Sequence, residues 1–186
     1  AWFDTKVLDE TGDEELAQGW TVQVLDTNGN GQRDAYVEPG EPLDPTKDTR
    51  IERGYYGVAP SPLDGSIWGS TLGMPGGLVR FVPGDDPVNT ALVEFYQVPW
   101  DDPEASVQGF GPRGMGVDSD GVVWTVLSSG HFASFDRSQC EGPLDGPTAT
   151  GRHCREGWTL YPFPGPNYKD ARDSGSAESA YFNFTD

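Results

Sequence analysis

The sequence predicts an all-β protein, and its composition is the first reason. Glycine (25) and proline (16) together exceed a fifth of the 186 residues, and they stand beside 6 Trp, 7 Tyr and 9 Phe. Aromatic residues interleaved with Gly and Pro are typical of many short strands joined by turns, and this aromatic content argues against disorder. Helix signals are confined to 13–17 and to the stretch around 102–105, each sufficient for a turn or two.

The second reason is a phrase that occurs twice. It leads from Gly57 to Trp68 and again from Gly114 to Trp124, with an Asp-Gly pair inside each copy. Asp-Gly between apolar segments predicts a hairpin, because glycine readily adopts positive φ. Self-similarity at a period of about 40–60 residues indicates a repeat architecture.

Each repeat contains four predicted strands in meander order. The first repeat has them at 57–59, 66–70, 77–81 and 91–98, and the second at 115–117, 122–126, 131–135 and 158–163. A four-stranded antiparallel meander is one blade of a β-propeller. The sequence therefore predicts a propeller whose blades share the same aromatic positions, with Trp68, Trp124, Tyr96 and Tyr161 expected in the core between blades.

The chain ends fit the same scheme, as a single propeller segment with about three blades. Its expected parts are a partial blade with a loop insertion (1–50), two blades (51–100 and 108–166, the latter with a cysteine-flanked loop) and the start of a further blade (175–186). In the first part, Trp2 is expected in a strand and 19–26 in a later strand. Propellers close with four to eight blades. Either further chain exists outside this sequence or the propeller is open, and the first alternative is favoured. The first residue, Ala1, indicates a processed protein or a fragment.

The charge balance excludes two classes of partner. There are 12 basic and 30 acidic residues, for a net charge of -18. Nucleic-acid binding needs a basic face to replace phosphate counterions, and anionic membranes disfavour so acidic a surface. The balance suits a self-repelling protein or one that attracts cations. No apolar run approaches the roughly 20 residues that span a bilayer.

The two cysteines flank an insertion rich in turn residues. A disulfide between Cys140 and Cys154 would close a loop of about 15 residues, worth about 3 kcal/mol in the chain-entropy model. Paired cysteines favour an extracytoplasmic compartment, periplasmic or secreted. The alternative is two free buried thiols. With only His153 nearby they do not make a zinc site.

One loop carries a metal-binding pattern, D-x-N-x-N-G-x-x-D. Its predicted calcium ligands are the side chains of Asp26, Asn28, Asn30 and Asp34 and the main-chain carbonyl of Gln32. Alternate residues converge on one side of such a loop, glycine permits the sharp bend, and Ca²⁺ prefers these hard oxygen donors. The alternative is an Asn-Gly-rich turn without metal.

The loop departs from an EF-hand at its end. The twelfth position, where an EF-hand has glutamate, is Val37, and Glu38 comes one residue late. The loop therefore resembles the calcium loops of secreted dockerin-type or thrombospondin-type repeats. Glu38 or Glu41 is a candidate for a late ligand, and the expected role of the ion is to pin a long connection between blades.

The repeat itself resembles the blade of streptogramin lyase (virginiamycin B lyase)-like propellers. The shared pattern is G-[VIM]-x…D-G-x-[IV]-W, a glycine turn, [LI]-x-R-[FL] and an aromatic strand ending in proline, over 57–99 and 114–164. Ser134 stands where the first repeat has Arg80. The resemblance implies a metal-assisted elimination by histidine and carboxylate near a central channel. The chain offers His131 as a weak catalytic candidate, or else a polar hairpin residue, whereas His153 is expected to be structural or solvated.

The sequence thus predicts a calcium-stabilised, disulfide-linked propeller that serves as a binding or scaffold module of a larger protein or complex. Its expected partner is the remainder of its own propeller or another protein chain, and no small-molecule ligand is indicated. Two alternatives remain open: a lyase-like or other metal-dependent enzyme, and a redox subunit with copper or a quinone cofactor. Both need several histidines, and two in the chain favour binding over catalysis.

Overall fold

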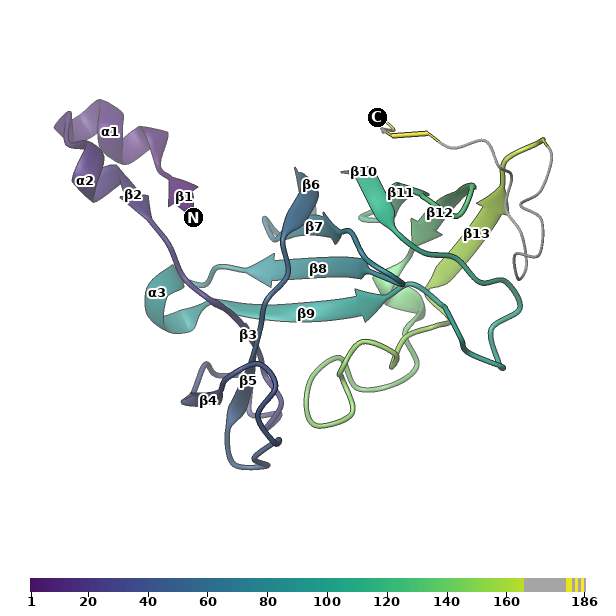
Figure 1. Cartoon of the computed structure of the whole chain (residues 1–186). Helices are drawn as coiled ribbons and strands as arrows, with labels where there is room; N and C mark the ends of the chain where they lie inside the picture. Colours follow the sequence, from purple (N-terminus) through teal and green to yellow (C-terminus); the bar gives the residue numbers. More distant parts are fainter. Residues whose placement is uncertain (166–179, 182, 184, 186) are drawn as a thin grey trace.

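The protein is mostly β, and its computed structural model describes residues 1–165, 180, 181, 183 and 185 (Figure 1). The described strands form one sheet of seven strands, one of four and one of two. Most neighbouring strands are antiparallel, and the exceptions are the pairs β3–β9 and β4–β5. The all-β prediction is confirmed at this level.

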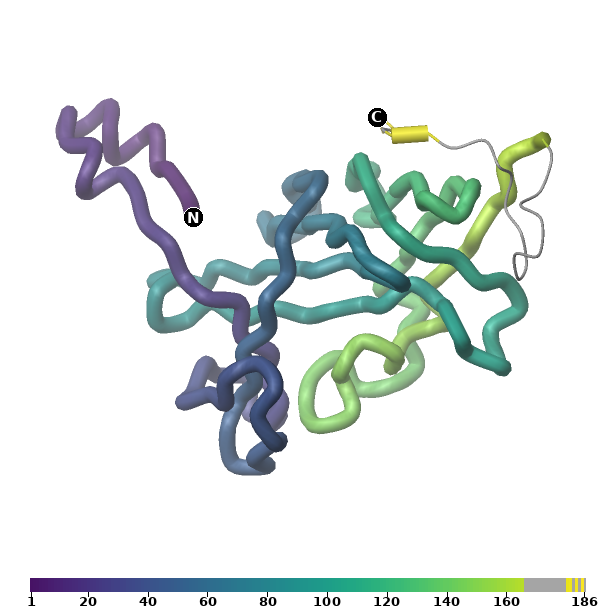
Figure 2. Tube along the Cα trace, in the orientation of Figure 1, coloured from purple at the N-terminus to yellow at the C-terminus, as the bar shows by residue number. Residues whose placement is uncertain are grey.

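A small unit precedes the main sheets and is joined to them by an extended stretch (Figure 2), and its first residues, Ala1 and Trp2, line a hollow together with Tyr55 and Val58 of β6 (Tyr55–Pro60). It consists of β1 (Trp2–Phe3), α1 (Thr5–Thr11), α2 (Glu14–Ala17) and β2 (Gln18–Gly19). Trp2 is in a strand as predicted, but that strand pairs with β2 in a separate two-stranded sheet. The unpredicted helix α1 begins at an Asp4 cap that accepts two amide hydrogen bonds and ends at Gly12, with φ 68°.

The first four-stranded meander has the predicted strands. They are β6 (Tyr55–Pro60), β7 (Ile67–Thr71), β8 (Gly77–Val82) and β9 (Leu92–Gln97), each antiparallel to the next. A short helix, α3 (Pro87–Thr90), joins β8 to β9, outside the two stretches where the sequence predicted helical turns. Pro87 suits the first turn of a helix, since it has no amide hydrogen to leave unpaired there.

Three further strands extend this sheet beyond β9. They are β3 (Gln23–Leu25), β4 (Tyr36–Val37) and β5 (Asp48–Ile51), in the order β4-β5-β3-β9. β3 lies parallel to β9 with Leu25 opposite Val93, so the strand predicted within 19–26 joins the first meander's own sheet. This pairing places the loop between β3 and β4 at one end of the extended sheet.

The second meander repeats the plan of the first. Its strands are β10 (Pro112–Val117), β11 (Val123–Leu127), β12 (His131–Phe135) and β13 (Trp158–Pro162). The predicted strands agree with these, because Asp-Gly and glycine turns separate short β-rich segments. A 3-10 turn, η1 (Arg137–Gln139), and the cysteine-flanked loop lie between β12 and β13.

The two meanders pack on each other through their first strands. β10 contacts both β6 and β7. The Ser70 hydroxyl donates to the Arg113 carbonyl, and a Cβ on Gly57 would come within 3.3 Å of the same carbonyl oxygen. The close approach of two backbones therefore favours the glycine that opens the repeated phrase.

A shared apolar core fills the space between the meanders. Trp68, Tyr96 and Phe135 are buried there, with the rings of Tyr96 and Phe135 4.5 Å apart. The expectation that all four recurring aromatics lie in this core holds for the first meander alone. In the second, Trp124 stacks on Tyr161 at 6.2 Å and Tyr161 is 46% exposed.

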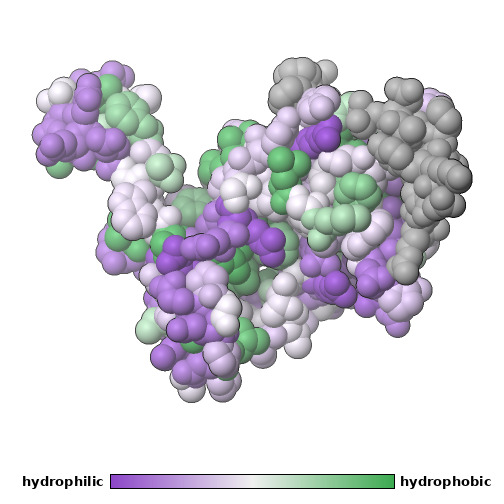
Figure 3. All heavy atoms as spheres, viewed as in Figure 1, coloured by the Kyte–Doolittle hydropathy of each residue, from purple (hydrophilic) through white to green (hydrophobic). Residues whose placement is uncertain are grey.

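The described residues contain two such meanders and no closed ring. The further blade expected over 175–186 falls largely outside the described residues, and among the rest Asn183 donates to the Trp124 carbonyl. The face of the first meander opposite the second one is partly uncovered. A hollow of about 260 Å³ lies there between the N-terminal segment, which contributes Ala1 and Trp2, and the meander, which contributes Tyr55, Val58, Ile67 and Phe81. Apolar residues are visible around β6 and β7 in Figure 3.

Candidate functional site

The predicted calcium loop connects the end of β3 to the start of β4 and folds on the carboxylate of Asp26. Asp26 Oδ1 accepts the amides of Gly29 (2.7 Å) and Asn30 (3.2 Å), and Oδ2 accepts the amide of Gly31 (2.6 Å). Gly29 and Gly31 have φ of 78° and 76°, which side-chain-bearing residues rarely adopt. The Asn-Gly pairs thus let the chain wrap around one buried acid.

The other predicted ligands surround Asp34. Its Oδ2 accepts the side-chain amides of Asn28 at 3.0 Å and Asn30 at 2.6 Å, and these hydrogen bonds lower the pKa of Asp34. The Asn28 and Asn30 Oδ1 atoms accept the amides of Asn30 and Gln32. The side chains of Asn28, Asn30 and Asp34 therefore lie together. Gln32 is exposed, and its carbonyl was the predicted donor.

A further acid, Asp48, lies against this loop and was missed by the sequence. Asp48 is the first residue of β5 and is fully buried, and its Oδ2 accepts the Asp34 amide at 2.7 Å. Burial raises the pKa of Asp48, and the charges of Asp26 and Asp34 raise it further. Asp48 follows Asp34 by fourteen positions, so no loop spacing indicated it; the only signal was an acid at the start of the segment 48–51.

The two late acids suggested by the sequence lie elsewhere. Glu38 forms an exposed ion pair with Arg50 at 2.7 Å, and Glu41 accepts the Glu38 amide at 3.4 Å. In the part of the chain that the structure describes, no group of three or more His, Cys, Asp or Glu side chains is placed to hold a metal ion. The loop's predicted donors are mainly amide and carbonyl oxygens, and its Asn side-chain amides occupy Asp34.

The disulfide is confirmed, and the loop that it closes packs on the Asp26–Asp34 loop. Cys140 and Cys154 are bonded. The Gly146 amide donates to the Asp26 carbonyl at 2.7 Å, and the Gln97 amide donates to the Gly151 carbonyl at 2.8 Å. Two insertions far apart in sequence are thus joined to each other and to the end of β9.

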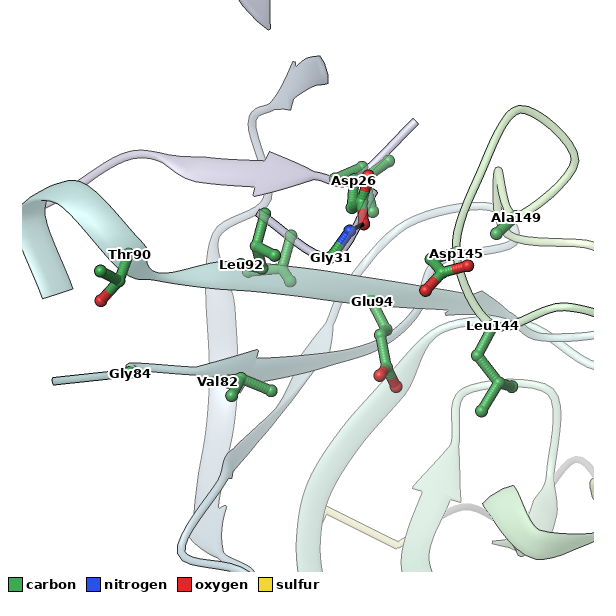
Figure 4. Close-up of a pocket in the computed structure, with 12 residues that line it drawn as sticks. Asp26, Gly31, Val82, Gly84, Thr90, Leu92, Glu94, Leu144, Asp145 and Ala149 are labelled. Atoms are coloured by element: carbon green, nitrogen blue, oxygen red, sulfur yellow. Dashed lines mark hydrogen bonds between the residues drawn. The ribbon is translucent and has the colours of Figure 1, made fainter. Parts of the chain in front are cut away.

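A cavity of about 310 Å³ lies between the two loops and the hairpin of β8 and β9. In Figure 4, Asp26 and Gly31 lie on one side of β9, and Asp145 and Ala149 of the disulfide loop face them. Glu94 also lines this cavity, but its carboxylate is committed to other side chains. The cavity is therefore enclosed where the Asp26–Asp34 loop and the disulfide loop pack together.

Glu94 is the centre of a polar network between the meanders. Its carboxylate accepts hydrogen bonds from Arg80 (2.7 Å), Tyr96 (2.6 Å) and Arg137 (2.7 Å to each oxygen). Arg80 also pairs with Asp64 at 2.6 Å. Because Arg137 comes from the second meander, this network fixes the position of one meander on the other.

The two histidines do not form a common site. His131 is buried at the start of β12, where its Nδ1 lies 3.0 Å from Ser129 Oγ. The His153 ring is tilted against the Tyr96 ring, with centroids 5.2 Å apart, and Tyr96 in turn contacts Phe135 at the other end of β12. His131 and Phe135 are four positions apart along β12, about 13 Å, so the two histidines lie near opposite ends of that strand.

Comparisons with protein-family models, curated proteins and solved structures found no match to this chain. The likeness to streptogramin lyase-like propellers therefore rests on the residue pattern alone and stays a hypothesis. Within the described residues, no helix combines the length and the apolar character needed to cross a bilayer.

Proposed function

We propose that this chain is a calcium-stabilised, disulfide-linked segment of a β-propeller, acting outside the cytoplasm as a binding or scaffold module. The observation that carries this proposal is the packing of two like meanders through β6, β7 and β10. Adjacent blades of a propeller are four-stranded meanders arranged around an axis. The disulfide between Cys140 and Cys154 supports an extracytoplasmic location, where such bonds persist.

The proposed partner is a further four-stranded unit of the same repeat, packed on the partly uncovered face of the first meander beside Ala1 and Trp2. This face and the face that packs on the second meander are the two sides of one sheet. Val58, in β6, is 60% exposed on this face. A structure of the protein in its longest natural chain tests this. Another meander against Val58 and Phe81 would support the proposal, and a solvent-exposed face would contradict it.

Calcium is proposed as the ion that pins the Asp26–Asp34 loop. The support is the meeting of the Asn28, Asn30 and Asp34 side chains and the folding of the same loop on Asp26, together with the buried Asp48, whose Oδ1 lacks a partner. Calcium would replace the two amide donors that now bind Asp34. Isothermal titration of Ca²⁺ into chelator-treated protein should show binding, and calcium should raise the melting temperature. The absence of both effects would refute calcium binding.

An enzymatic function is less well supported by the described residues. The lyase-like and copper-site alternatives both need several convergent histidines, and His131 and His153 lie at opposite ends of β12. His131 is buried beside Ser129. Any catalytic constellation would therefore have to include residues other than this pair.

A further inference from the structure

We propose that Asp48 is a ligand of the calcium ion, supplied from β5 in place of the acid that the loop lacks at its twelfth position. This inference rests on the proposed calcium binding, because it names a ligand of the same site. It also changes the expected role of the ion, which would then join the loop to the central strand of the β3–β5–β4 group.

The first argument is an unsatisfied oxygen on a buried side chain. Asp48 is 0% exposed, and its Oδ2 accepts the Asp34 amide. The Asn28 amide lies near enough to lower the pKa of Asp48, but no donor is placed to complete a hydrogen bond to Oδ1. A buried polar atom without a partner is costly, and the cost is larger for a charged group. A divalent cation bound to Oδ1 would remove that cost.

The second argument is topological. β5 lies between β3 and β4, so its first residue is adjacent to both ends of the loop that connects those strands. Asp48 pairs with Tyr36 at the start of β4, and Thr49 pairs with Leu25 at the end of β3. The strand order therefore brings Asp48 to the loop despite its distance in sequence.

The third argument is the charge around the acids. Among the described residues, no ion pair involves Asp26, Asp34 or Asp48. The nearby Arg33 side chain donates to Thr21 Oγ1 at 2.8 Å and to the Ala91 carbonyl at 3.1 Å. Three carboxylates without a basic partner favour a cation with hard-oxygen preference, which is the chemistry of Ca²⁺.

Calcium titrations of four proteins test the assignment: the wild type, Asp48→Asn, Glu38→Gln and Glu41→Gln. The two glutamate variants are matched controls, because they remove the acids that follow the loop directly in sequence. Asp48→Asn should weaken calcium binding by about tenfold or more, since it removes a charged ligand, and the controls should stay within about twofold. Circular dichroism and thermal melting in chelator should show that each variant is folded.

Terbium separates a ligand from a merely structural residue. Tb³⁺ occupies calcium sites, and its luminescence lifetimes in H₂O and D₂O count the water molecules bound to the ion. If Asp48 binds the ion directly, Tb³⁺ in Asp48→Ala, which has no side-chain oxygen at this position, should gain an additional bound water. In Glu38→Gln the water count should not change.

The outcomes are distinguishable. If the wild type binds neither Ca²⁺ nor Tb³⁺, calcium binding itself is refuted, and the assignment of Asp48 with it. If the wild type binds calcium but Asp48→Asn binds equally well and the water count of Asp48→Ala is unchanged, the assignment of Asp48 is wrong while calcium binding stands. Weakening by Glu38→Gln or Glu41→Gln instead of Asp48→Asn would likewise overturn it.

Discussion

At the scale of single residues, the polar contacts of Glu94 decide how the two meanders are held. Its carboxylate receives donors from Arg80 within the first meander and from Arg137 in the second, and its side chain is 16% exposed. Burial raises the pKa of Tyr96, and the Glu94 charge raises it further, so the phenol remains a donor to Glu94. Such a network is strong only while every member has its partner.

Removing the Glu94 carboxylate should therefore destabilise the protein. We expect Glu94→Ala to lower the free energy of unfolding by about 3 kcal/mol, because it leaves Arg137 half-buried and Arg80 without its inner partner. Urea denaturation would measure this. The control is Glu52→Ala, because Glu52 is exposed and pairs with Arg50; this variant should cost at most about 1 kcal/mol. Equal effects of the two variants would mean that the network adds nothing.

His153 gives the protein a pH dependence with a definite sign. Burial lowers the pKa of His153, against the opposing charges of Glu94 and Glu156. The unfolded chain therefore binds a proton more readily than the folded one. Stability is complete above the unfolded pKa of about 6.5 and is lost as the pH falls towards the lower folded pKa.

The melting temperature of the wild type should therefore fall between about pH 7 and pH 5 more steeply than that of His153→Gln. His131 is present in both proteins, so its contribution cancels in the comparison. Calorimetric melting at several pH values would show the difference. Parallel curves would indicate that His153 titrates normally in the folded protein.

At the scale of elements, the Asp26–Asp34 loop and the disulfide loop act as one unit. Gly29 and Gly31 allow a controlled test, since both have positive φ but only Gly29 lies close to the disulfide loop. A Cβ on Gly29 would lie 3.3 Å from Gly146 Cα, whereas a Cβ on Gly31 would meet no atom within 4 Å. Alanine at either position is thus under the same kind of backbone strain, but only alanine at position 29 also contacts the disulfide loop.

We expect Gly31→Ala to cost about 1 kcal/mol from backbone strain and Gly29→Ala to cost more, because it also pushes the disulfide loop away. Urea denaturation in the presence of chelator would compare the two without a contribution from calcium. A larger effect at Gly31 would contradict the interloop contact.

The sequence predicted elements where local signals and tertiary structure agree. The eight strands of the two meanders follow from Asp64-Gly65, Asp120-Gly121 and the other glycine turns. Helix α1 was missed because its signals are the caps Asp4 and Gly12, with no apolar period between them. The order β4-β5-β3-β9 was not predictable, since a parallel pairing between 25 and 93 leaves no local trace.

The residues of the candidate site likewise fall into those that the sequence predicted and those that it did not. Asp26, Asn28, Asn30 and Asp34 could be named because alternate residues of one tight loop must converge. Asp48 could not, because only the strand order places it beside the loop. The contact from Gly146 to Asp26 was equally hidden, since it joins two insertions that the repeat pattern treats as separate.

At the scale of the whole molecule, the net charge of -18 opposes compaction through self-repulsion. The basic residues Arg80, Arg137 and Arg155 each pair with acids at contacts within or between the meanders and their loops. The acids of the Asp26–Asp34 loop have no such partner among the described residues. A divalent cation at that loop would relieve repulsion where the basic side chains do not.

The two faces of the first meander differ: the second meander covers one, and the other holds the hollow beside Val58. If this face is the binding site of another meander, it should bind an uncharged apolar dye such as Nile red, which the acidic surface does not repel. We expect Val58→Lys to lower the dye fluorescence, because it places a charge on the apolar face. Leu43→Lys is the control, since Leu43 is 62% exposed and Val58 60%, but Leu43 lies in the connection between β4 and β5. Neither substitution should change the free energy of unfolding by more than about 0.5 kcal/mol, because both positions are at the surface. Equal fluorescence from both variants would show that the dye does not bind beside Val58. That result would contradict the proposal that a further blade packs on this face.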